Sequence, residues 1–239
     1  MRTLPIIFIA SLLLISGYVQ AHEVAEHPAS AGFLDPVNSI FYSIAIVVMI
    51  CLVSMVFGSR LNNKHKKILF ILILAPVLFS TIYLAGSTVY MNIVSETGGP
   101  VHWHADFEIW VCGQKVLLKG PEALDNKVGT ATLHHHNEGK ELDGRYRMHV
   151  EGVLAKLEEA NLGHFFESTG NLLTQNSMGL FLMDGSQKRW SNGDICPNTG
   201  KPGKLKVLVN NRQIENFTEY VISPYTNVPP GDFIKIVFE

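Results

Sequence analysis

The run VHWHADFEIWV at residues 101–111 predicts a long β-strand, and it contains the most informative pair of residues in the chain. His102 and His104 are separated by one residue, so their side chains lie on the same face of that strand. Residues along a strand rise by about 3.3 Å each, and two imidazoles at this spacing can bind one metal ion. Trp103 faces the other way and is expected to pack into the core.

Two more pairs with the same spacing follow, and together the three pairs predict a metal site. His134 pairs with His136, and His149 pairs with Glu151 on a second predicted strand, residues 146–151. Imidazole nitrogens bind Zn or Cu at about 2.0–2.1 Å, and a carboxylate can complete the shell. The candidate metal ligands are therefore His102, His104, His134, His136, His149 and Glu151.

Histidines also have ordinary structural roles, and this alternative is kept open. The cluster can consist of polar groups on a strand surface that pair with Glu108, Glu138 and Glu151. His135 is expected to point away from its two neighbours, as an outer partner of the site or toward solvent. His164, next to Phe165 in a helical segment, is expected to be a surface or core histidine.

The rest of this half of the chain predicts an α+β domain over residues 95–239. The expected fold is rich in antiparallel β-hairpins, and residues 153–166 are expected to form one or two short helices, the second capped by Asn161. Asp184-Gly185 between two apolar runs predicts a hairpin turn. The remaining expected strands are residues 115–118, 130–136, 179–183, 187–190, 204–209 and 233–238.

The first part of the chain predicts export and membrane anchoring. Residues 1–21 have the charge, apolar core and exit of a secretory signal peptide, which is expected to be cleaved after Ala21 or else to stay as an uncleaved first anchor, followed by an extracytoplasmic segment at 22–39. Residues 40–58 and 68–92 carry no charged side chain and predict two transmembrane helices. The basic loop between them, 59–67, is expected in the cytoplasm, so the C-terminal domain would lie outside the cytoplasmic membrane, in the periplasm or at the cell exterior.

Charge and cysteine usage narrow the classes of partner and chemistry. The formal net charge of −2 gives no reason to expect nucleic acid as a partner. Cys112 and Cys196 lie in the exported part, where an oxidising compartment favours a disulfide between them, whereas Cys51 lies within a predicted span. Thiol–disulfide exchange is disfavoured, because the chain has no CxxC motif.

Four short motifs resemble a family of exported or membrane-anchored bacterial and archaeal domains of uncharacterised function. They are VHWHA at 101–105, LHHHN at 133–137, MHVEG at 148–152 and NLGHFFE at 161–167, which match HxHA, HxH, HVE and LGxFF. The resemblance covers residues 101–239, and the six candidate ligands match the histidine and acidic positions of its pattern. Some members are labelled protein-disulfide isomerase. Residues 102–108 also resemble the first half of a cupin motif, HxH with Glu four residues on.

Three functions follow as hypotheses. The first is a membrane-anchored metal-binding module for Cu or Zn that serves the cell envelope as an accessory protein. The second is a metal-dependent hydrolase or oxidoreductase, with Glu151 or Glu108 as a base near metal-bound water. The third is a structural subunit of a membrane complex, whose helices pack on an envelope protein partner. The chain has no second catalytic motif such as HExxH or GxSxG, which favours the first.

Overall fold

The computed structural model describes residues 36–122, 126–137, 144–222 and 231–239, and the chain separates into two units, residues 1–86 and 87–239. The expected signal peptide, most of the expected segment 22–39, and Glu138 lie outside the described residues. Each unit is described by itself.

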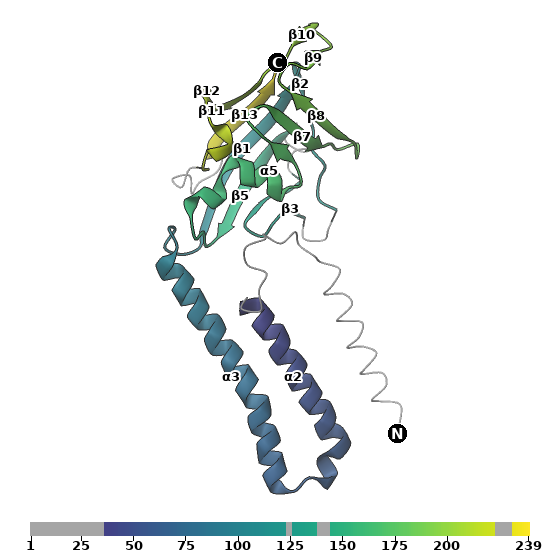
Figure 1. Ribbon diagram of the computed structural model, residues 1–239, viewed down its shortest axis with the longest axis vertical. Coiled ribbons are helices and arrows are strands. Elements are labelled where there is room, and N and C mark those ends of the chain that lie inside the picture. The colour runs from purple at the N-terminus through teal and green to yellow at the C-terminus, as the bar shows by residue number, and fades with distance from the viewer. Residues whose placement is uncertain (1–35, 123–125, 138–143, 223–230) are drawn as a thin grey trace. The chain divides into compact units, whose positions relative to one another are not determined.

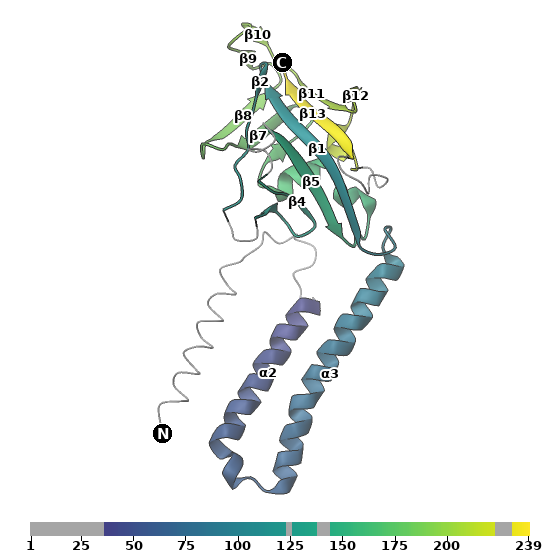
Figure 2. The same cartoon turned by 180° about the vertical axis from the view of Figure 1, so that it is seen from behind.

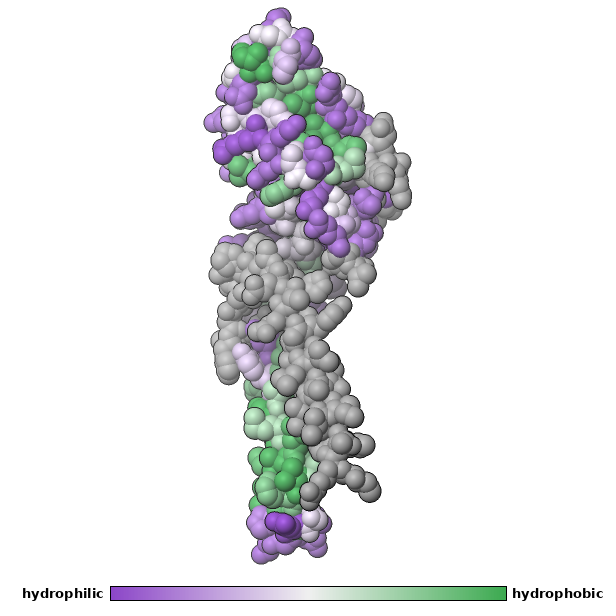
Figure 3. Space-filling model, turned by 90° about the vertical axis from the view of Figure 1, so that its right-hand side faces the viewer, coloured by the Kyte–Doolittle hydropathy of each residue, from purple (hydrophilic) through white to green (hydrophobic). Residues whose placement is uncertain are grey.

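Two long apolar helices form the described part of the first unit, and the second continues beyond residue 86. Helix α2 spans Pro36–Phe57 and is followed by a 3-10 turn, η1, at Gly58–Arg60, and helix α3 spans Asn63–Val94 (Figure 1). Both are long and apolar enough, by length and composition, to cross a membrane. In the space-filling view their surface is largely apolar, and polar side chains gather at the turn between them (Figure 3).

The turn between the helices is shorter than the sequence predicts. Residues 63–67 were expected in a loop, but they form the first turns of α3. The reason is local, because the Asn62 side chain accepts a hydrogen bond from the backbone N–H of His65 at 3.0 Å and so caps the helix.

Small hydroxyl residues mark the contact between the two helices. Ser43 of α2 donates a hydrogen bond to the carbonyl oxygen of Pro76 in α3 at 3.1 Å, and the Ser43 and Ser80 side chains are buried. Pro76 breaks the regular hydrogen bonding of its helix, which membrane helices tolerate when neighbouring groups satisfy the backbone. Small side chains at such a contact let two helices approach closely.

One eight-stranded sheet organises the second unit, with strand order β12-β11-β13-β1-β5-β4-β3 and β2 paired to β1 at the side. Strand β1 pairs in parallel with β13, and the other described pairs of this sheet are antiparallel. The strands are β1 (Val101–Val111), β2 (Gln114–Lys115), β3 (Val128–Gly129), β4 (Leu133–His135), β5 (Arg145–Gly152), β11 (Leu205–Val209), β12 (Arg212–Ile214) and β13 (Asp232–Phe238).

The two faces of this sheet differ, because side chains alternate along each strand. Phe107 of β1 is fully buried and packs on Phe165 and Phe166 of helix α5 (Leu162–Ser168), with ring centroids 5.4 and 6.3 Å apart. The odd-numbered residues of β1, Trp103 included, therefore face the core. Figure 2 shows the sheet from the side opposite α5, with β1 and β5 in front. This side carries the even-numbered residues of β1.

Short elements complete the unit, and most match the sequence-based expectations. The two expected short helices are the 3-10 helix η2 (Leu157–Ala160) and α5, and Asn161 caps α5 by accepting the backbone N–H of His164 at 2.8 Å. The expected hairpin around Asp184-Gly185 joins β7 to β8. The remaining elements are β6 (Leu172–Leu173), β7 (Ser177–Phe181), β8 (Gln187–Ser191), β9 (Ile195–Cys196), β10 (Lys201–Pro202) and η3 (Phe217–Glu219).

The predicted disulfide is present. Cys112, in the turn after β1, is bonded to Cys196 in β9 across 84 residues of sequence. A link of this length stabilises a fold by about 4 kcal/mol in the chain-entropy model, a substantial share for a small domain. Cys51 of α2 is the free thiol among the three cysteines of the chain.

Candidate metal centre

Strand register brings the three predicted pairs to one place on the sheet. Strand β5 lies between β1 and β4, and its His149 is directly opposite both His104 of β1 and His134 of β4. One rung along, His102 of β1 is opposite Glu151 of β5. The alternation of side chains puts all of these groups on the face away from α5.

The imidazole rings gather around His149. Its ring centroid lies 4.7 Å from that of His104, 4.7 Å from that of His136, and 5.2 Å from that of His134, whose ring is stacked parallel to it. His102 joins through His104, with ring centroids 4.5 Å apart. The five histidines named from the sequence therefore form one cluster, the histidine cluster.

The ligand atoms of this cluster fall into two trios. One trio is His102, His104 and His149, and the other is His134, His136 and His149. Within each trio one nitrogen of every residue lies within 4.8 Å of the others, which is close enough to hold a metal ion. His149 belongs to both trios.

Glu151 contacts histidines from both trios through one oxygen. Its Oε1 lies 3.3 Å from Nε2 of His102, 3.8 Å from Nδ1 of His149 and 3.9 Å from Nε2 of His134. Its Oε2 lies 3.6 Å from Nζ of Lys127. Burial alone would raise the pKa of the Glu151 carboxyl, but the surrounding histidines and Lys127 outweigh it and lower that pKa. The side chain is therefore an anion at neutral pH.

Two of the histidines are held neutral by their surroundings. Burial, followed by the neighbouring His149 and His102, lowers the pKa of His104 from 6.5 to about 4. Burial, followed by the charge of Lys127, likewise lowers the pKa of His134 to about 4. A neutral imidazole is the form that binds a metal ion.

His134 has two ring nitrogens that are buried without a hydrogen-bond partner among the described residues, and its side chain is fully buried. Its Nε2 approaches Oε1 of Glu151 at 3.9 Å, which is too long for a hydrogen bond. Buried polar atoms of native proteins are nearly always paired, with protein groups, water or a ligand, so these nitrogens could bind a metal ion.

His136 is oriented by the backbone. Its Nδ1 lies 2.6 Å from the carbonyl oxygen of Asn126, so Nδ1 carries the proton and donates it. Nε2 is then unprotonated, and its lone pair is available to a metal ion. This hydrogen bond from the second ring nitrogen to a carbonyl is the usual support of a metal-bound histidine.

Two expectations about neighbouring residues are corrected. Glu108 does not join the cluster, because it lies two rungs away opposite Arg145 and forms ion pairs with Lys115 at 3.2 Å and Lys235 at 3.8 Å. His135 does point away from His134 and His136, but it does not face solvent. The opposite face of β4 is the core, where His135 is fully buried and its Nδ1 lies 2.8 Å from the carbonyl oxygen of His136.

Sequence inspection missed three neighbours of the cluster. Asp106 and Arg147 face each other one rung from His104 and His149 and form a two-point ion pair, with Nε to Oδ1 at 2.8 Å. Their spacing of two residues from His104 and His149 was a usable signal. The sequence gives no such signal for Lys127, because Lys127 lies just before the two-residue strand β3, which the sequence does not predict.

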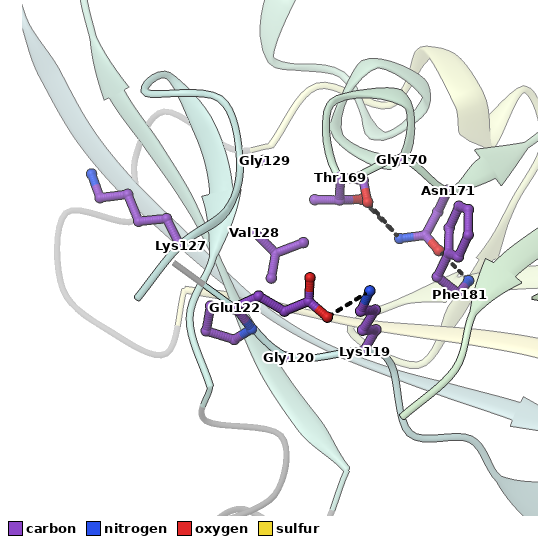
Figure 4. A pocket seen from close by; sticks show the side chains of 11 residues that line it. Lys119, Gly120, Glu122, Lys127, Val128, Gly129, Thr169, Gly170, Asn171 and Phe181 are labelled. Carbon is purple, nitrogen blue, oxygen red and sulfur yellow. Dashed lines mark hydrogen bonds and ion pairs between the residues drawn. The ribbon is translucent and has the colours of Figure 1, made fainter. Parts of the chain in front are cut away.

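A separate cavity of about 380 Å³ lies beside α5 and the loop after β2 (Figure 4). Its charged groups Lys119 and Glu122 pair with each other at 2.8 Å, and its Asn171 is engaged by Thr169 and the backbone of Phe181. Lys127 points away from this cavity in the figure, and its Nζ pairs with Glu151 instead. The charged groups that line the cavity among the described residues are therefore already paired.

Comparison with family models, with curated proteins and with solved structures finds no match for this chain. The second unit is thus characterised by its own geometry, in which a cluster able to hold metal ions lies on a mixed sheet of an α+β domain.

Proposed function

We propose that this protein is a membrane-anchored metal-binding accessory protein of the cell envelope, which binds Zn or Cu through its histidine cluster and Glu151. The observation that carries the proposal is His134, whose buried ring nitrogens have no hydrogen-bond partner among the described residues. A metal ion bound there would satisfy one of them and offset a cost of about 1–3 kcal/mol for an unpaired buried polar group.

The chemistry of the donor set favours Zn or Cu over Mg or Ca. Each trio offers three imidazole nitrogens, and imidazole suits zinc and copper, whereas Mg and Ca prefer sets made of oxygen atoms alone. The low pKa values of His104 and His134 keep both rings neutral at physiological pH. The anionic Glu151 supplies charge to compensate a divalent ion.

Metal analysis of the full-length protein in detergent tests the proposal. The chain is purified through a histidine-free tag, exposed to ZnCl₂ or CuCl₂, dialysed, and measured by mass spectrometry together with its thermal midpoint. We expect bound metal and a raised midpoint, and we expect His134→Asn to bind less metal and to show a smaller rise of the midpoint. His65→Asn is the matched control, because His65 is exposed and lies on α3.

A wild-type chain that holds no metal and gains no thermal stability would overturn the proposal. The same holds if His65→Asn loses as much metal as His134→Asn, because binding would then be nonspecific.

We further propose that α2 and α3 anchor the protein in the cytoplasmic membrane, with the second unit outside. The support is the charge asymmetry of the sequence, which places Arg60, Lys64, Lys66 and Lys67 in and just after the turn between the helices. The disulfide agrees with an oxidising compartment. The apolar surface of the helices would also suit packing on an envelope protein partner.

A metal-dependent enzyme of the envelope is the second candidate, favoured by the uneven exposure of the cluster. The His102 side chain is 60% exposed, whereas that of His134 is fully buried, so one side of the site opens to solvent. Three protein ligands and an open fourth position are typical of catalytic zinc. Glu151 would then act as base. If azide shifts the visible spectrum of the cobalt-loaded protein, the open position exists; an unchanged spectrum favours the accessory protein.

A further inference from the structure

The composition of the histidine cluster raises the question of how many ions it holds. Five imidazoles and one carboxylate exceed the four ligands that zinc usually takes. Two atoms bound to the same ion at about 2.1 Å can lie at most about 4.2 Å apart. The ligand atoms of each trio lie within 4.8 Å of one another, so small side-chain movements bring them within this limit, and the two trios have only His149 in common.

We propose that the cluster binds two transition-metal ions, one in each trio, with His149 and Glu151 between them. This inference rests on the proposed metal-binding function and adds the number of ions and the roles of two residues. His102 and His104 hold the first ion, and His134 and His136 hold the second.

The positions of His149 and Glu151 fit a shared role. His149 is a member of both trios, and its ring lies 4.7 Å from His104 on one side and 4.7 Å from His136 on the other, centroid to centroid. Its strand, β5, is the middle one of the three. Imidazole has two ring nitrogens, so His149 can bind an ion with each once it has released its ring proton to solvent.

Glu151 reaches the same two sides through its carboxylate. Oε1 lies 3.3 Å from Nε2 of His102 in the first trio and 3.9 Å from Nε2 of His134 in the second. A carboxylate can donate both oxygens to metal ions, and the negative charge offsets repulsion between two divalent ions. Lys127, 3.6 Å from Oε2, holds this side chain in place until the ions bind.

The two sites differ in their access to solvent. The first trio contains His102, the most exposed member, and the second contains the fully buried His134. A chelator in solution therefore reaches the first ion sooner. Loss of metal to EDTA is expected in two phases of equal size.

The number of zinc ions per full-length chain in detergent tests this inference. Wild type is expected to hold two, and His102→Ala and His136→Ala one each. Neither of these side chains is among the fully buried residues, so both variants should keep the fold, which circular dichroism checks. His164→Ala is the matched control, because His164 lies on α5 at the other face of the sheet, and it should retain two ions.

Electron paramagnetic resonance of the copper-loaded chain tests the shared ligands. Two Cu²⁺ ions joined through His149 or Glu151 couple, so wild type should show much less signal than its copper content predicts. His102→Ala should show the full signal of one isolated ion.

The outcomes separate the two proposals. One zinc ion in wild type, lost in both His102→Ala and His136→Ala, would overturn the two-ion site and leave metal binding intact. Full copper signal from two ions would show that they share no ligand and would overturn the role of His149 and Glu151. A wild-type chain without metal would overturn the proposed function itself.

Discussion

At the scale of single residues, the histidine cluster is unfavourable for the chain by itself. Burying an imidazole without hydrogen bonds costs free energy, and His134 is buried in this way. Burial and the charge of Lys127 lower the pKa of His134 to about 4, so the ring stays neutral. A residue that destabilises the metal-free fold but suits a ligand is typical of a functional site.

The stability of the metal-free protein should therefore fall in mild acid. The pKa values of His104 and His134 are about 4 in the folded chain and 6.5 ordinarily, so between these pH values the unfolded chain binds more protons. Stability is retained above pH 6.5 and lost as the pH falls toward 4, by at most about 3 kcal/mol per histidine. The thermal midpoint, measured between about pH 7 and pH 5, reports this loss of stability, since ordinary carboxylates stay ionised in that range.

His134→Asn provides the comparison, because it removes one of the two groups. Its thermal midpoint should depend less steeply on pH than that of the wild type, whatever its midpoint at neutral pH. A wild-type midpoint that does not change between about pH 7 and pH 5 would contradict the low pKa values.

At the scale of elements, the ribbon of β3 and β4 decides whether the second trio forms. These strands have two and three residues, yet they carry His134 and lead directly to His136. Gly129 of β3 pairs with His134 and has φ +125°, a backbone conformation that favours glycine. A Cβ at this position would collide with the carbonyl oxygen of Leu133. The glycine thus allows the close approach that positions His134.

Gly129→Ala should therefore weaken metal binding without touching a ligand. We expect a loss of stability of more than about 2 kcal/mol and a roughly 10- to 100-fold weaker zinc affinity, as for other changes that misplace ligands. Titration calorimetry on the full-length protein gives the affinity.

Gly185→Ala is the control for Gly129→Ala. Gly185 also has positive φ, +81°, but a Cβ there would meet nothing within 4 Å, and it lies in the turn between β7 and β8. This variant should lose some stability and keep its zinc affinity. Equal losses of affinity in both variants would show that Gly129 has no specific role.

At the scale of the whole molecule, the two units differ in how much apolar surface they expose. The first exposes large apolar side chains along both helices, whereas the second buries its apolar residues in a core and carries charged and polar groups on the sheet face away from α5. Exposed apolar area on this scale is stable only when lipid or protein covers it. The predicted topology follows from this contrast together with the position of the basic residues.

Cysteine labelling tests the predicted topology. In a Cys51→Ser background the disulfide leaves no free thiol, so one introduced cysteine reports its own position. We expect Gln187→Cys, exposed on β8, to react with a membrane-impermeant maleimide on intact cells, and Ser59→Cys, in the turn after α2, to react only after lysis. The reverse pattern would place the second unit in the cytoplasm.

The sequence by itself determined the local features of this protein. The long strand 101–111, the short helices with the Asn161 cap, the hairpin at Asp184-Gly185 and the two apolar helices follow from patterns within a few residues of one another. The three ligand pairs were also visible, because alternation along a strand fixes which side chains share a face.

Only the tertiary structure decided which of these features meet. Strand β1 pairs with β5 and in parallel with β13, more than a hundred residues further on, and such a register depends on long-range packing that no local pattern encodes. The same register brings His149 between His104 and His134, excludes Glu108, and turns His135 into the aromatic core. Lys127 and the carbonyl of Asn126 join the site through β3, a strand of two residues that pairs with β4.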